Sequence, residues 1–153
     1  MGGPVAIDLD GALGDTRPLW NDWLTAVAGT LGIDGSELPA DRGEAAAELD
    51  RRGGGNWRAL LERFCEERAA VYLRRDASTS AALKALASSG SSIGVFTDAP
   101  AALASVALAH LGADRHVVAV ETGAGALEHL LQRLGDEAVV VRTRAELVQQ
   151  ASA

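Results

Sequence analysis

Short apolar runs rich in valine and isoleucine recur along the chain, and most of them are followed by a stretch with helical spacing. The runs cover residues 4–9, 92–97, 116–120 and 138–142. Continuous apolar runs of this length predict strands that are buried on both faces. The helical stretches that follow the last three runs cover residues 101–111, 126–134 and 144–150. Alternation of buried strands and helices predicts an α/β fold with a doubly wound parallel sheet.

A long helical insertion separates the first two predicted strands. Residues 16–88 contain no strand-like run, and their apolar positions follow helical spacing. The expected helices cover residues 18–32, 44–52, 57–72 and 80–88. The sequence therefore predicts a helical cap, residues 16–88, inserted after the first strand of a core made of residues 1–15 and 89–153.

Two carboxylates, Asp8 and Asp10, stand where the first strand is expected to end. Ligands of open parallel sheets bind beyond the carboxyl ends of the strands, and residues two apart along a strand point the same way. Two such anions repel each other by about 4 kcal/mol at about 4 Å in a medium of effective dielectric about 20. A divalent cation, usually Mg²⁺, would relieve this repulsion. The alternative is that both acids only form turns and caps.

Thr97 and Asp98 end the second predicted strand in a similar way, and Pro100 follows them at the start of a helix. The hydroxyl of Thr97 and the N–H groups of a helix N-terminus are suitable donors for a phosphate. A helix cap without any ligand is the alternative interpretation of the same residues.

These motifs resemble those of the haloacid dehalogenase (HAD) superfamily, and of its phosphoglycolate-phosphatase-like members in particular. Residues 7–16 (IDLDGALGDT) are similar to the first motif and residues 94–98 (GVFTD) to the second. The helical insertion resembles the small cap of this group, and the likeness covers nearly the whole chain. It implies that Asp8 is a nucleophile that forms an aspartyl-phosphate and that Asp10 is the acid/base.

The same resemblance implies that Thr97 and Asp98 bind the phosphate of a small phosphorylated molecule. It also implies that Asp8 and Asp10 hold Mg²⁺.

Two positions depart from the pattern of this family. Residues 121–135 resemble the third motif, with Glu121 in place of its lysine, and residues 139–147 resemble the fourth, with Arg142 in place of an acid. Loss of one preorganised donor costs about 10²–10³ in rate, and Arg142 would compete with Mg²⁺ for the carboxylates. We therefore expect weak or absent Mg²⁺ binding and slow or absent phosphatase activity. Because the two charges are exchanged together, an ion pair between Glu121 and Arg142 is also expected.

The alternative function is that of a non-catalytic pseudoenzyme, which binds a ligand or a protein partner through the same scaffold. The chain ends soon after the last predicted helix, where relatives in this family usually add a strand, so one sheet edge should be exposed. A homodimer that covers this edge is the association we expect.

Composition limits the classes of partner. The 153 residues are 48% hydrophobic, which suits one compact domain. A net charge of −7 and a pI near 4.9 predict repulsion from nucleic acid and from anionic membranes. The single cysteine, Cys65, cannot form an internal disulfide, and neither a leader-like N-terminus nor an apolar run of about eighteen residues is present. We expect a cytoplasmic protein that binds neither nucleic acid nor membrane.

Overall fold

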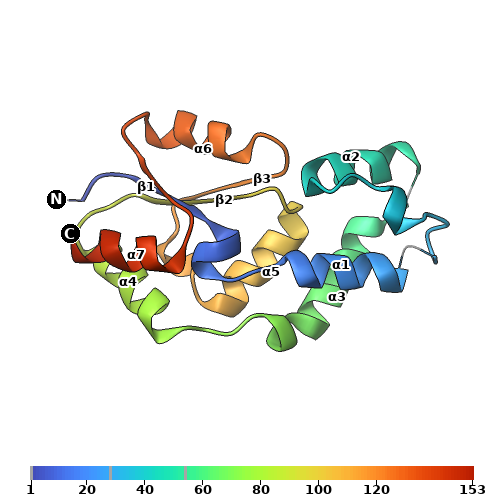
Figure 1. Cartoon of the computed structure of the whole chain (residues 1–153), viewed down its shortest axis with the longest axis horizontal. Coiled ribbons are helices and arrows are strands. Elements are labelled where there is room, and N and C mark those ends of the chain that lie inside the picture. The colour runs from blue at the N-terminus through green and yellow to red at the C-terminus, as the bar shows by residue number, and fades with distance from the viewer. Residues whose placement is uncertain (1, 28, 54) are drawn as a thin grey trace.

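The computed structural model describes residues 2–27, 29–53 and 55–153, and its centre is a parallel four-stranded sheet of order β3-β2-β1-β4 (Figure 1). The strands are β1 (Val5–Asp8), β2 (Ile93–Thr97), β3 (Ala119–Thr122) and β4 (Val139–Val141). Both neighbours of β1 run parallel to it, and so does β3 beside β2. The predicted α/β class and parallel sheet are confirmed. The third strand starts later than expected, because residues 114–116 form a short 3-10 turn.

Helices cover both faces of the sheet, and the alternation of side chains along each strand decides which face they reach. In β1, Ala6 packs with the helix on one face, whereas Val5 and Ile7 pack with the helices on the other. Figure 1 shows α6 alone on the first face and α4, α5 and α7 on the second. Their bounds are α4 (Ala77–Ser88), α5 (Ala101–Leu111), α6 (Ala126–Leu134) and α7 (Arg144–Ser152).

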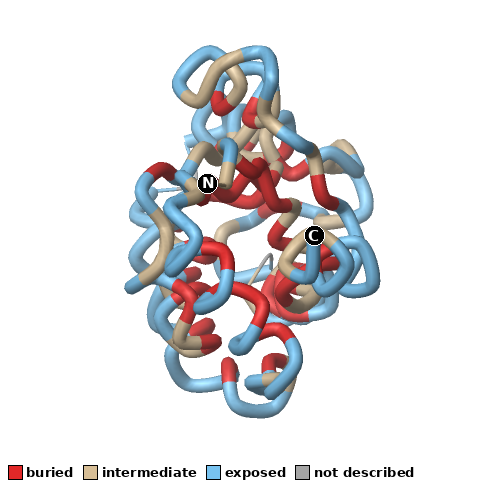
Figure 2. Tube along the Cα trace, turned by 90° about the vertical axis from the view of Figure 1, so that its left-hand side faces the viewer, coloured by how far each residue is buried: buried red, intermediate tan, exposed pale blue. Residues whose placement is uncertain are grey.

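A second lobe is inserted after β1, and its described residues form three α-helices and a short 3-10 helix, Gly35–Glu37. The α-helices are α1 (Arg17–Val27), α2 (Arg42–Arg51) and α3 (Trp57–Tyr72). Their shared core contains the three tryptophans of the chain, with ring centroids 5.2 Å apart for Trp20 and Trp23 and 6.0 Å apart for Trp23 and Trp57. In Figure 2 buried positions, in red, gather toward the middle of the trace, and most of the outer turns are exposed. No helix in the described part of the chain is long and apolar enough to cross a membrane.

Two helix bounds in this lobe differ from the prediction by two residues or more. The first helix ends at Val27, not near residue 32; residue 28 lies outside the described residues, and Gly32 takes a positive φ of 71° in the turns that follow. The second begins at Arg42, two residues early, because the Asp41 carboxylate accepts a hydrogen bond of 2.9 Å from the N–H of Glu44. This earlier start places Arg42 in the first turn of α2.

Helix α4 lies within the segment expected to be the cap, but it packs on the core. Ala82, Leu83 and Leu86 belong to the same buried cluster as Val5 and Ile7 of β1. We propose that the cap consists of α1 to α3 and ends at residues 73–76, which link α3 to α4.

The link between the two lobes contains an acid whose charge stabilises α4. The Asp76 carboxylate accepts hydrogen bonds from the Ser78 hydroxyl and from the N–H and hydroxyl of Thr79, with Arg144 nearby. These contacts, the Ser78 bond first, lower the pKa of Asp76 to about 2. A lowered acid pKa stabilises the fold above the ordinary value near 4, and the effect is lost as the pH falls toward 2.

We therefore expect Asp76→Ala to lower the melting temperature at pH 7 and to lose this effect between about pH 4 and about pH 2. Thermal unfolding followed by circular dichroism across this range measures it. Asp136→Ala, which changes an exposed acid in the turn before β4, is the matched control. A deficit that persists unchanged at the lowest pH would contradict the role given to the Asp76 charge.

Candidate active site

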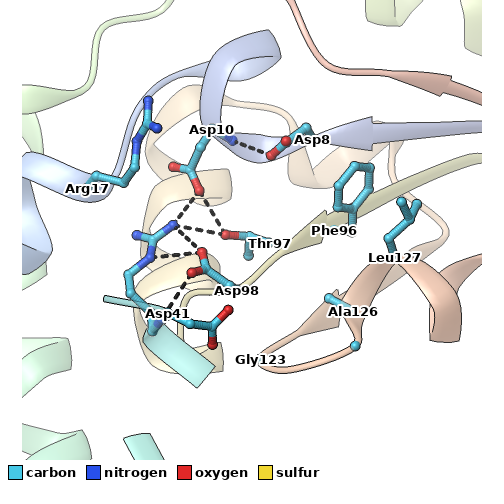
Figure 3. A pocket seen from close by; sticks show the side chains of 12 residues that line it. Asp8, Asp10, Arg17, Asp41, Phe96, Thr97, Asp98, Gly123, Ala126 and Leu127 are labelled. Atoms are coloured by element: carbon cyan, nitrogen blue, oxygen red, sulfur yellow. Dashed lines mark hydrogen bonds and ion pairs between the residues drawn. The ribbon is translucent and has the colours of Figure 1, made fainter. Parts of the chain in front are cut away.

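A pocket of about 340 Å³ lies beyond the carboxyl ends of β1 and β2 and extends to the loop before α6. Its lining includes all four residues that the sequence singled out at the strand ends, Asp8, Asp10, Thr97 and Asp98. Figure 3 shows the carboxylates of Asp10 and Asp98 and the hydroxyl of Thr97 turned toward one point. The parallel register, in which Asp8 is level with Phe96, brings Thr97 beside the first-strand acids.

Asp8 has the least engaged carboxylate of the strand-end acids. Its Oδ1 accepts a hydrogen bond of 3.1 Å from the N–H of Asp10, and its Oδ2 lies 3.6 Å from Nη1 of Arg142. Burial raises the pKa of Asp8; the charges of Asp10 and Asp98 act in the same direction, whereas the backbone hydrogen bond and Arg142 oppose them. The side chain is 21% exposed, so this carboxylate is open to a ligand in the pocket.

A tight turn directs Asp10 away from Asp8. Residues 9–13 form a single π-type turn in which Gly11 has a φ of 114°. A side chain at Gly11 would also lie 2.6 Å from the carbonyl oxygen of Arg142, so glycine is required twice over. The turn lets the N–H and hydroxyl of Thr16 reach Oδ1 of Asp10, at 2.8 and 2.7 Å.

The central cation of the site is Arg42, which the sequence analysis did not single out. It comes from the first turn of α2 in the helical lobe, and its side chain is only 3% exposed. Its Nη2 lies 2.5 Å from Oδ2 of Asp10 and 2.8 Å from Oδ1 of Asp98, and its Nη1 donates to the Thr16 hydroxyl at 2.7 Å. The sequence carries one signal for the position of Arg42. Asp41 is a helix-capping type of residue, and a helix that it caps begins at Arg42.

Asp98 binds the lobe through the same arginine. Its Oδ1 accepts from Nε of Arg42 at 3.0 Å as well as from Nη2, and its Oδ2 accepts from the Arg42 N–H at 3.0 Å. Burial acts to raise the pKa of Asp98, but the hydrogen bonds and charge of Arg42 together outweigh it and lower the pKa. Both oxygens of the Asp98 carboxylate are bonded to Arg42. The phosphate-binding role expected for Asp98 stays a prediction.

The expected ion pair between Glu121 and Arg142 is wrong. Glu121 pairs with Arg133 of α6 at 3.6 Å, and Arg142 lies beside Asp8. The physical reason is the strand order: Glu121 is on β3 and Arg142 follows β4, the two outer strands of the sheet. Three strand spacings of roughly 4.8 Å separate these strands by about 14 Å. Glu121 is also not among the residues that line the pocket.

The residues of the site do not fit a divalent metal in this arrangement. Within the described ranges, no three acidic, histidine or cysteine side chains are grouped as metal ligands. Oδ2 of Asp10 and both carboxylate oxygens of Asp98 accept hydrogen bonds from Arg42, and Asp8 lies beside Arg142. The weak Mg²⁺ binding expected from the sequence stays a prediction, for which these contacts supply a geometric reason.

The sheet order and the helical lobe after β1 form an α/β fold like that of solved HAD-type structures. The chain is similar to a beta-phosphoglucomutase-like protein from Thermotoga maritima, with 18% identity and a TM-score of 0.56 over 98% of this chain and 82% of that one. It is also similar to a HAD phosphatase from Thermococcus onnurineus, with 21% identity and a TM-score of 0.56 over 92% and 76%. No family model and no curated protein sequence matches. At these identities the likeness establishes the fold alone.

Proposed function

We propose that this protein is a phosphatase-type hydrolase with low turnover that acts on small phosphate esters, with Asp8 as nucleophile. The observation that supports it is the convergence of Asp8, Asp10 and Thr97 at the ends of neighbouring strands, in one pocket. Asp8 is the acid whose Oδ2 has no hydrogen-bond donor within the described residues, so this atom is available for attack.

In this mechanism Oδ2 of Asp8 attacks phosphorus, and the bond from phosphorus to the ester oxygen breaks. Asp10 must first take up a proton from solvent, which it then gives to the leaving oxygen. The Asp10 carboxylate next takes a proton from the water that attacks phosphorus, the bond from phosphorus to Oδ2 of Asp8 breaks, and phosphate leaves. Arg142 lies 3.6 Å from Asp8 but is not among the residues that line the pocket. Its side chain is 55% exposed, so it is a weakly preorganised substitute for a buried lysine.

The same geometry explains why turnover should be slow. Asp10 must exchange protons with the substrate, yet it is held by Arg42, Thr16 and Thr97. The Thr97 hydroxyl donates to Asp10 at 2.9 Å, so it must turn before it can donate to a phosphate. Each turnover therefore requires these contacts to break first.

A second candidate function is favoured by the same contacts with Asp10. A pseudoenzyme would keep the pocket for binding a small phosphorylated molecule or a protein partner, without the chemistry.

The homodimer also stays a prediction. The strand that it would cover is β4, at the edge of the sheet, where the Val139 side chain is 42% exposed.

Hydrolysis of a generic aryl phosphate with Mg²⁺ present tests the proposed function. We expect wild-type turnover well below the roughly 10 s⁻¹ typical of enzymes, and a fall of at least about tenfold in Asp8→Asn, because an amide is a poor nucleophile. Asp22→Asn makes the same change on the exposed face of α1 and should leave the rate unchanged. Equal rates in the wild type and Asp8→Asn would contradict the nucleophile, and no turnover in either would favour the pseudoenzyme.

A further inference from the structure

Arg42 links three parts of the molecule that are distant in the sequence. Its guanidinium contacts Asp10 after β1 and Asp98 after β2, while its own backbone belongs to the helical lobe. The Asp10 and Arg42 side chains are buried, at 9% and 3% exposed, whereas the Asp98 side chain at the rim of the group is 38% exposed. A buried cation between two acids plays the electrostatic part that a metal ion plays between acids elsewhere.

Asp10 has no capacity left for another cation. An ionised carboxylate offers about four lone-pair positions. Oδ1 accepts from the N–H and hydroxyl of Thr16, and Oδ2 accepts from Nη2 of Arg42 and the hydroxyl of Thr97. A metal ion can bind Asp10 only if one of these donors leaves. Arg42 is the donor whose positive charge also repels the metal.

The start of α2 is also packed tightly on the core. A Cβ atom added at Gly43 would lie 2.4 Å from the backbone nitrogen of Ala124 and 2.9 Å from the carbonyl carbon of Gly123. Only glycine allows so close an approach between α2 and the loop before α6. Arg42 therefore enters the site because the lobe is closed, and moving α2 outward would withdraw the guanidinium.

We propose that Arg42 is a resident cation that latches the helical lobe over the site and excludes Mg²⁺ from Asp10. Arg42 and Mg²⁺ are alternative partners of the same carboxylate, so metal binding requires α2 to move. The inference rests on the proposed site, but not on its catalysis. Metal affinity is measured without substrate, so a failure here is distinguishable from a failure of the phosphatase assay.

Titration calorimetry with Mg²⁺ alone tests the latch. Arg42→Met keeps the apolar stem and removes the charge, so we expect its dissociation constant for Mg²⁺ to be at least about tenfold lower than that of the wild type. Arg51→Met is the control, because it removes an exposed arginine of the same helix that pairs only with Glu48 among the described residues. It should leave the affinity for Mg²⁺ at the wild-type value.

Gly43→Ala is the second variant, and it keeps Arg42. Alanine favours the helix but forces α2 away from Ala124, so Mg²⁺ should bind more tightly than in the wild type. If Arg42→Met does not fold, this variant decides the question. The proposal is overturned if every variant of this pair that folds binds Mg²⁺ no more tightly than the wild type does.

Discussion

Replacement of Arg42 by methionine should lower the free energy of unfolding by about 3 kcal/mol at neutral pH without divalent cations. Removing one partner of a buried ion pair typically costs about 3–5 kcal/mol, because the other charge is stranded. The lower end applies here, since the Asp98 side chain is 38% exposed and water can solvate it. Urea denaturation measures the change. Arg51→Met, on the exposed side of α2, should shift it by no more than about 0.5 kcal/mol.

Adding Mg²⁺ should return part of the stability that Arg42→Met loses, because a ligand that binds only the native state stabilises it. The wild type should gain less at the same concentration, since Arg42 already occupies Asp10. A loss below about 1 kcal/mol in Arg42→Met, the size of an exposed pair, would contradict the buried group described above.

Trp57→Ala should destabilise the protein by about 3–5 kcal/mol, the usual cost of emptying a large aromatic site in a core. Trp57 is 1% exposed, packs 6.0 Å from Trp23, and donates from Nε1 to Asp50 at 2.9 Å. Its loss removes the centre of the lobe that positions Arg42. Urea denaturation again measures the effect.

Trp57→Phe is the matched variant, because it keeps an aromatic ring in the core while it loses the bond to the half-exposed Asp50 and the smaller ring of the indole. It should cost clearly less than the alanine variant. Equal losses for phenylalanine and alanine would contradict the stabilising role given to the packing of the aromatic ring.

The sheet could be predicted because its signal is local. Strands buried on both faces must be apolar throughout, so Ile7 and Val95 lie in runs that are visible without any tertiary information. The acids at the strand ends followed from the same pattern, since the carboxyl ends of parallel neighbours meet at one edge. The sequence pattern alone therefore predicts that Asp8, Asp10 and Thr97 lie together.

Arg42 could not be predicted in the same way. It lies 32 residues from Asp10 and 56 from Asp98, so its role exists only once the lobe folds back on the sheet. In the sequence it is an ordinary charged residue beside a helix start. The predicted ion pair between Glu121 and Arg142 is wrong for a related reason. The motifs show that the two charges are exchanged, but only the order of the strands shows that β3 and β4 lie at opposite edges of the sheet.

A crystal structure of the wild-type protein grown with millimolar Mg²⁺ would show directly which cation Asp10 holds. We predict that the Arg42 guanidinium remains between Asp10 and Asp98 with the lobe closed, and that no metal ion contacts Asp10. A Mg²⁺ ion bound to Asp8 and Asp10 while Arg42 stays in place and the lobe stays closed would contradict the latch.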